Sequence, residues 1–303
     1  MFKGKDAQRL LVYLLFAFGF TWCLFLPYLF AGNVWGENGA RDQLAALGML
    51  CPTLAMLAAR YVTKEGFAVT GEDSMVLGIS FKNGKWVWFL AAMLLPWIYY
   101  EAGHGLLFAL QPAAFDLHSP MIAEMEEITG NDHSLIYLQP LSAIVTGTVV
   151  SFAAFGEEAG WRGYMMPKMI KLWGVNRAVV IGGFIWGMWH WPLTYVGHNF
   201  GREYWGYPFT GFLAMGIFCI FIGVLLTFVT VRSGSVWPAT IMHAVNNASP
   251  SVLMFYFNEE KISGWWRDRL VIFGITFLPM MVMAVIAWKK LNQVSGIEKT
   301  ENS

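Results

Sequence analysis

The sequence predicts an all-α integral membrane protein, a polytopic helical bundle with about eight transmembrane helices. Of its 303 residues, 56% are hydrophobic and only 13% are charged, and the mean hydropathy is +0.49. A soluble globular domain carries more charge than this. The apolar runs also repeatedly reach the ~17 to 25 residues that a helix needs to cross a bilayer. Because 20 basic residues balance 20 acidic ones, the net charge favours no nucleic-acid partner.

The apolar runs define the transmembrane helices that we expect. The first run is longer than the apolar core of a signal peptide and is followed by further runs, so it predicts a helix that stays in the protein. The fourth run is too short to span alone, and we expect its helix to continue through Glu157 and Arg162 toward Lys168. The expected spans are 10–31, 44–62, 86–110, 141–155 with its continuation, 178–196, 209–231, 236–257 and 270–288.

The distribution of Lys and Arg predicts the orientation, because these residues are enriched in cytoplasmic loops. The segment 111–140 contains no Lys or Arg but several acidic residues, as an outer loop does. The alternation of basic and non-basic loops between the expected spans places both termini in the cytoplasm. The loop with Lys261, Arg267 and Arg269 is an exception, because it is basic where an outer loop is expected. Since no repeat or linker interrupts the chain, we expect one membrane domain over residues 1–303.

Three polar clusters interrupt the apolar chain, at residues 157–162, 186–190 and 243–247. Together they hold two carboxylates, one guanidinium, two imidazoles and a carboxamide. Ionisable groups at membrane depth are costly and persist mostly where they line a cavity, pair with each other or do chemistry. With a rise of ~1.5 Å per residue, the clusters reach overlapping depths on the cytoplasmic side. The sequence therefore predicts an intramembrane catalytic cavity.

Spacing within the clusters predicts which side chains share a helix face, because residues four apart do so. Glu158 and Arg162 are expected to form an ion pair that supports the site, and Glu157, about 100° away, is free to face the cavity. The same rule puts two further pairs on common faces, Trp186 with His190 and His243 with Asn247. Trp186 is expected to pack or to form a wall of the cavity.

These groups suit hydrolysis of an amide without a side-chain nucleophile. A carboxylate near an imidazole in a pocket of low dielectric can act as general base toward water. A second imidazole and a carboxamide can donate hydrogen bonds to a developing oxyanion.

A catalytic zinc site is an open alternative, with Glu157, His190 and His243 as ligands and a fourth position for water. No HExxH helix is present, and the candidate ligands come from three separate segments. The three cysteines form no CxxC pair, which argues against a disulfide framework or a zinc–cysteine site. A metal is therefore not required by the pattern, and no cofactor is certain.

The clusters resemble the signature of a family of intramembrane proteases, the CPBP family. This family comprises CAAX prenyl endopeptidases of the Ras-converting type and bacteriocin-processing or self-immunity proteins, also called the Abi family. The resemblance covers residues 144–249, which form the core motif region. It is carried by three ordered motifs, which are Glu157-Glu158-x-x-x-Arg162, Trp186-x-x-x-His190 and His243-x-x-x-Asn247.

The resemblance implies an endopeptidase whose cavity opens to the cytosol. By analogy, Glu157 activates water with His190 nearby, His243 and Asn247 bind the oxyanion, and the neighbouring ion pair supports the site. The implied partner is a membrane-embedded peptide or a lipidated protein. The flanks of the motifs resemble bacterial members, so we expect a multi-pass protein of a bacterial plasma membrane.

Two other functions are compatible with the same residues. A proton-coupled transporter would use Glu157 and the histidines as a relay, although the inverted repeats of many transporters are not visible. A non-catalytic immunity or scaffold protein would bind a peptide without cutting it, yet it has no need of both a base and an oxyanion donor.

Overall fold

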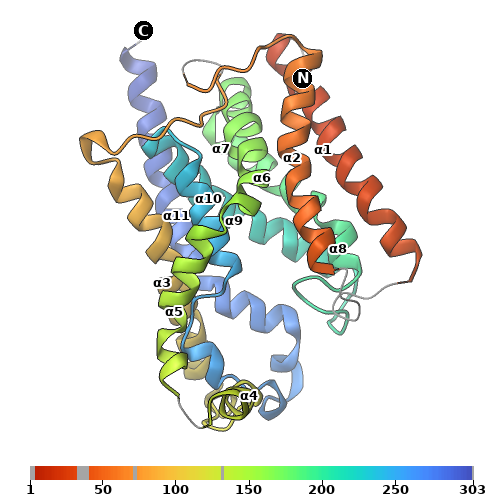
Figure 1. Cartoon of the computed structure of the whole chain (residues 1–303), viewed down its shortest axis with the longest axis vertical. Helices are drawn as coiled ribbons and strands as arrows, with labels where there is room; N and C mark the ends of the chain where they lie inside the picture. Colours follow the sequence, from red (N-terminus) through yellow and green to blue (C-terminus); the bar gives the residue numbers. More distant parts are fainter. Residues whose placement is uncertain (1–3, 33–40, 71–73, 131–132, 302–303) are drawn as a thin grey trace.

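The fold is an all-helical bundle (Figure 1), seen in a computed structural model that describes residues 4–32, 41–70, 74–130 and 133–301. Within these ranges the chain forms helices and connecting loops, with no β-strand. The α-helices are α1 Lys5–Phe30, α2 Arg41–Val62, α3 Trp86–Leu110, α4 Pro120–Thr129, α5 Ser134–Val149, α6 Phe152–Gly160, α7 Met166–Trp189, α8 Trp191–Tyr195, α9 Phe209–Ser233, α10 Trp237–Asn247 and α11 Arg269–Glu301.

The protein is an integral membrane protein, and its helical class is confirmed. Four helices among the described residues are long and apolar enough to cross a bilayer, and a pair of helices bent by 61° makes five if it counts as one span. The number eight that the sequence predicted is therefore not confirmed. The four spans are Lys5–Phe30, Leu44–Val62, Phe209–Ser233 and Arg269–Gln293, and the bent pair is Ser134–Val149 with Phe152–Trp189.

The predicted span 236–257 is wrong, because its helix, α10, ends after 11 residues. Ser249 has a φ of 50°, outside the helical region, and it precedes Pro250. A residue before proline is disfavoured in the α conformation. The backbone N–H groups of Val252 and Leu253 then donate to the carboxylate of Glu101 at 2.6 and 3.2 Å. This carboxylate on α3 fixes the chain in a non-helical path.

The boundaries around the first cluster agree only in part with the sequence. The chain continues as a helix through Glu157 and Arg162, as predicted, by way of α6, a π-helix Trp161–Met165 and α7. Gly174, with a φ of 76°, breaks α7 where the fourth and fifth predicted spans meet. The segment predicted as a loop at 111–140 contains α4 and the beginning of α5.

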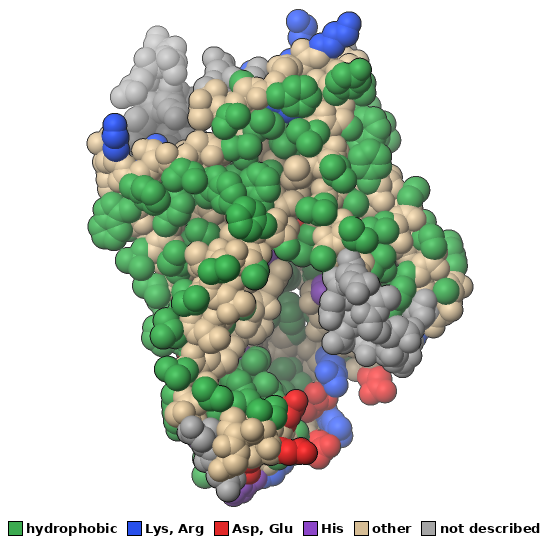
Figure 2. Space-filling view, in the orientation of Figure 1, with side chains coloured by type: hydrophobic (Ala, Val, Ile, Leu, Met, Phe, Trp, Pro, Cys, Tyr) green, Lys and Arg blue, Asp and Glu red, His purple; other side chains and the backbone are tan. Residues whose placement is uncertain are grey.

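Charge is distributed unevenly along the long axis of the molecule. Both termini lie at the same end in Figure 1, and α4 lies at the opposite end. In Figure 2 Lys and Arg side chains show at both ends of the molecule, whereas the visible Asp and Glu side chains show near the end with α4. This agrees with termini on one side of the membrane, and their cytoplasmic location stays a prediction from the charge rule.

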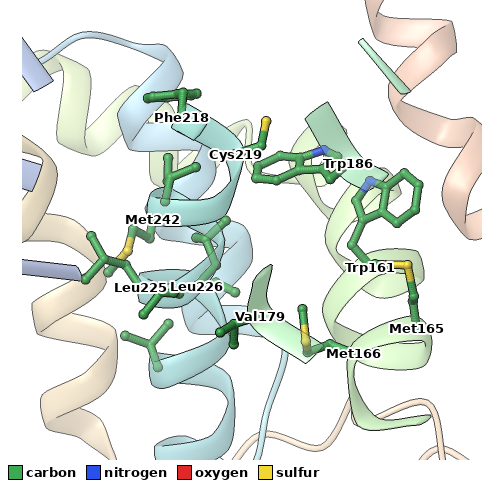
Figure 3. Close-up of a cluster of buried hydrophobic side chains, with 14 of the residues drawn as sticks. Trp161, Met165, Met166, Val179, Trp186, Phe218, Cys219, Leu225, Leu226 and Met242 are labelled. Atoms are coloured by element: carbon green, nitrogen blue, oxygen red, sulfur yellow. The ribbon is translucent and has the colours of Figure 1, made fainter. Parts of the chain in front are cut away.

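Helices α7 and α9 approach each other closely because glycines lie between them. A Cβ atom at Gly183 would lie 2.5 Å from Cα of Ile220, and one at Gly187 would lie 2.5 Å from Cα of Gly216. Small residues let helix backbones pack tightly in membranes, where lipid offers no hydrophobic drive between helices. Figure 3 shows the buried cluster formed there, to which α7 contributes Val179 and Trp186. The contact holds Trp186 in the site described below.

Gly183→Ala is expected to destabilise the protein by about 1–3 kcal/mol, because the new methyl group meets backbone that cannot move aside. Thermal unfolding in detergent measures the loss. Gly19→Ala is the matched control, since this glycine of α1 has nothing within 4 Å of the added Cβ. It should leave stability unchanged or raise it slightly. Equal losses in the two variants would contradict this account of the α7–α9 contact.

Candidate active site

All four residues that the sequence predicted as catalytic line one cavity of about 630 Å³. Their side chains come from α6, the end of α7 and α10, and the wall is completed by residues of α1, α2, α3, α8, α9 and α11. Figure 2 shows the molecule hollowed near its middle, with histidine side chains visible in the hollow. The four residues are Glu157, His190, His243 and Asn247. Their roles stay predictions.

Glu157 is buried, with 3% of its surface exposed, and faces the cavity. Its Oε2 accepts a hydrogen bond of 2.8 Å from Nε1–H of Trp186. A single neutral donor orients one carboxylate oxygen, and the other, Oε1, accepts no hydrogen bond from the residues that the structure describes. Trp186 is therefore more than a wall, because it holds the carboxylate in place.

Glu158 is absent from the described lining of the cavity and forms the ion pair expected from its spacing. Its Oε1 accepts from Nη1 of Arg162 at 3.1 Å, and both side chains are almost fully buried. The same oxygen lies 2.8 Å from Nδ1 of His243 on α10. The imidazole thus contacts Glu158, a partner on another helix that the spacing within single clusters did not reveal.

Arg162 also holds Trp186, because its guanidinium lies 4.0 Å from the centre of the indole ring. Such a cation–π contact is stronger where water is excluded. Arg162 lies in the π-helix, whose wider turn is rare and often marks a functional site. One guanidinium therefore positions the carboxylate of Glu158 directly and that of Glu157 through Trp186.

The π-helix is anchored at its far end by a third buried carboxylate, Glu65, in the loop after α2. Lys168 lies 2.9 Å from this carboxylate, and the hydroxyl of Tyr164 donates to it. Burial alone would raise the pKa of Glu65, but the bonds from Lys168 and Tyr164 outweigh it and lower that pKa below its usual value. An ionised Glu65 thus ties the segment that bears Arg162 to α2.

His190 ends α7 and is held by its own helix. Its Nδ1 lies 2.9 Å from the backbone carbonyl of Trp186, so Nδ1 carries the proton and donates. The remaining nitrogen, Nε2, then has its lone pair free on this cavity-lining ring. His243 is oriented by the same device, with Glu158 in place of the carbonyl.

His198, which lies between the predicted spans 178–196 and 209–231 and was not predicted as a site residue, also lines the cavity. Its ring is nearly parallel to that of His190, with an angle of 7° and 6.4 Å between ring centres. Three residues with positive φ, Gly197, Asn199 and Gly201, turn the loop inward. The glycines flanking His198 were the signal in the sequence, because glycine and asparagine tolerate such backbone angles.

The candidate zinc ligands do not fit a metal ion in this arrangement. Across the ranges that the structure describes, no three His, Cys, Asp or Glu side chains form a group that could hold one. We therefore derive no step through a metal.

Comparison with known proteins supports the resemblance seen in the motifs. A family model described as Type II CAAX prenyl endopeptidase Rce1-like matches residues 139–249, which contain all three motifs. CAAX prenyl protease 2 of Methanococcus maripaludis is 24% identical over 139 residues, which are 46% of this chain and 47% of that protein. The similarity thus spans about half the length of the relative. It confirms the resemblance to the CAAX protease family.

Proposed function

We propose that this chain, whose residues 139–249 match the CAAX protease family, is an intramembrane endopeptidase. It hydrolyses a peptide bond of a membrane-associated or lipidated peptide or protein. The observation that supports this best is Glu157, a buried carboxylate fixed by Trp186 in a cavity that also holds His190, His243 and Asn247. A base and oxyanion donors in one cavity are the requirements of amide hydrolysis.

In the proposed first step, Glu157 accepts a proton from a water molecule in the cavity. The oxygen of that water bonds to the carbonyl carbon of the substrate, and the carbonyl electron pair moves to its oxygen. His190 assists by accepting a hydrogen bond at Nε2, which holds the water beside the carboxylate. Since Trp186 occupies only Oε2, the other oxygen of Glu157 is free to take the proton.

In the second step, the negative charge on the former carbonyl oxygen is stabilised by His243 and Asn247. The carboxylate of Glu158 offsets the positive charge of His243 when both of its ring nitrogens are protonated. The tetrahedral intermediate then re-forms its C=O bond as the C–N bond breaks, and the amine nitrogen takes the proton from Glu157. One water is consumed, and a carboxylic acid and an amine are released.

The composition of the cavity wall supports a substrate with an apolar chain next to its scissile bond. Phe218, Phe273 and Phe277 line the cavity and contact one another, with ring centres 4.5 to 5.2 Å apart. These rings offer an apolar surface on the side formed by α9 and α11, whereas the polar groups come from the other helices. A lipid chain on the substrate would fit the aromatic side.

The test is cleavage of defined peptides by the purified protein in liposomes, read by mass spectrometry. One peptide carries a prenylated cysteine near its carboxyl terminus, and a matched peptide carries a free cysteine. Cleavage of either at a single bond supports the endopeptidase, and preference for the first supports the lipidated class. Binding without cleavage of these and of unmodified membrane peptides would favour the non-catalytic alternative.

Chelation is expected to leave the cleavage rate unchanged, because Glu157 supplies the base without a metal. The protein is dialysed against EDTA and then assayed with and without added Zn²⁺. A matched sample tested with a zinc peptidase checks that the chelator works. Loss of activity that Zn²⁺ restores would contradict the metal-independent mechanism.

A further inference from the structure

We infer that Tyr99 is a positioning residue for the oxyanion-binding amide of Asn247, and that it acts through Asn246. The inference rests on the proposed function, because it names a group that prepares one of the proposed oxyanion donors. It concerns three side chains on two helices, α3 and α10.

The three side chains form a directed chain of hydrogen bonds. The hydroxyl of Tyr99 donates to Oδ1 of Asn246. Nδ2 of Asn246 then donates to Oδ1 of Asn247 at 3.2 Å. Tyr99 is fully buried and Asn246 is 6% exposed, so water does not compete readily for the bond between them.

The direction of these bonds fixes how the Asn247 amide faces the cavity. Because its Oδ1 accepts from Asn246, the donor group Nδ2 lies on the other side of the carboxamide. A carboxamide rotated by a half turn would present an oxygen to the oxyanion, which repels it. A phenolic hydroxyl can donate or accept a hydrogen bond, and here it donates to the carbonyl oxygen of Asn246. Tyr99 therefore supports this orientation of Asn246 and, through it, that of Asn247.

Tyr99 does not serve as a cavity wall or as the main anchor of α10. Its neighbour Tyr100 lines the cavity, and Tyr99 is absent from the lining residues that the structure describes. Tyr100 also donates to the backbone carbonyl of Asn246 at 3.1 Å, which holds the end of α10 independently. Removal of the Tyr99 hydroxyl should therefore change the orientation of an amide while the backbone stays in place.

Tyr99→Phe tests the inference with a matched control. We expect kcat to fall about tenfold while KM stays constant, since an interaction made only in the transition state is lost. Tyr13→Phe makes the same change at another fully buried tyrosine, whose hydroxyl has no hydrogen-bond partner among the described residues. It should keep the wild-type kcat. Wild-type turnover in Tyr99→Phe would overturn the inference.

A double-mutant cycle separates positioning from a general structural role. If Tyr99 acts through Asn247, Tyr99→Phe should have no further effect in an Asn247→Ala background. If the losses of kcat in the two single variants multiplied in the double variant, and Tyr99→Phe also lowered the unfolding temperature, Tyr99 would have a structural role. That result would overturn the inference.

Nuclear magnetic resonance of the Asn247 side-chain amide tests the relay without substrate. Its ¹⁵N and ¹H signals should move in Tyr99→Phe and stay in place in Tyr13→Phe. Unmoved signals in Tyr99→Phe would overturn the relay. If the signals move in Tyr99→Phe but the wild-type protein cleaves no peptide, the relay is supported and the endopeptidase is refuted. The two failures are therefore distinguishable.

Discussion

Glu157→Gln is expected to lower the rate of peptide hydrolysis by ~10²–10⁴-fold, the contribution typical of a general base. Glutamine has nearly the same shape, and its carbonyl oxygen can still accept the hydrogen bond from Trp186. It cannot take a proton from water. The variant should therefore bind substrate and unfold at the wild-type temperature while kcat collapses, as measured by single-turnover cleavage in liposomes.

Glu101→Gln is the matched control for this change. Glu101 is a carboxylate of α3 that accepts backbone N–H groups at 252 and 253 and is absent from the described lining of the cavity. Its substitution should lower stability modestly and leave kcat unchanged. If Glu157→Gln kept a rate close to that of Glu101→Gln, Glu157 would not be the base.

Arg162→Met is expected to lower stability by about 3–5 kcal/mol, because it removes the guanidinium from the buried carboxylate of Glu158 and leaves only the imidazole of His243 beside it. The side chains of Arg162 and Glu158 are 2% and 0% exposed. Chemical unfolding in mixed micelles measures the loss. Trp186 also loses the cation on its ring, so activity should fall with stability.

The double variant Arg162→Met with Glu158→Gln should recover most of the stability, since no charge is then left unpaired. It should not recover activity, because His243 loses the carboxylate at Nδ1. Arg269→Met is the exposed counterpart, in a pair with Glu259 whose side chains are 47% and 27% exposed. It should cost at most about 1 kcal/mol. If Arg162→Met lowered stability by no more than Arg269→Met, the stabilising role of the buried ion pair would be contradicted.

The long apolar runs made much of the fold predictable. The predicted span 86–110 coincides with α3, and 209–231 differs from α9 only at its end. Average hydropathy failed at 236–257 because it cannot register a break at Ser249 or a carboxylate from α3 that binds the backbone beyond it. Contacts of this kind join residues about 150 positions apart, and no local pattern contains them.

The candidate site was predictable where one helix sets the geometry. The spacing of four residues was sufficient to predict the ion pair of Glu158 with Arg162. The spacing could not predict the contact of Glu158 with His243, because the two residues lie on different helices. It also could not predict the π-helix that brings Arg162 over the ring of Trp186. His198 was missed because a loop with positive φ angles, rather than a helix face, brings it to the cavity.

The central claim is that Glu157 activates a water molecule which attacks the substrate directly. A single turnover in H₂¹⁸O, with enzyme in excess over peptide, tests it most directly. We expect the new carboxyl group to carry one ¹⁸O atom from the first turnover onward. First-turnover product that holds ¹⁶O from the protein would show that Glu157 attacks the carbonyl itself, and it would contradict the account.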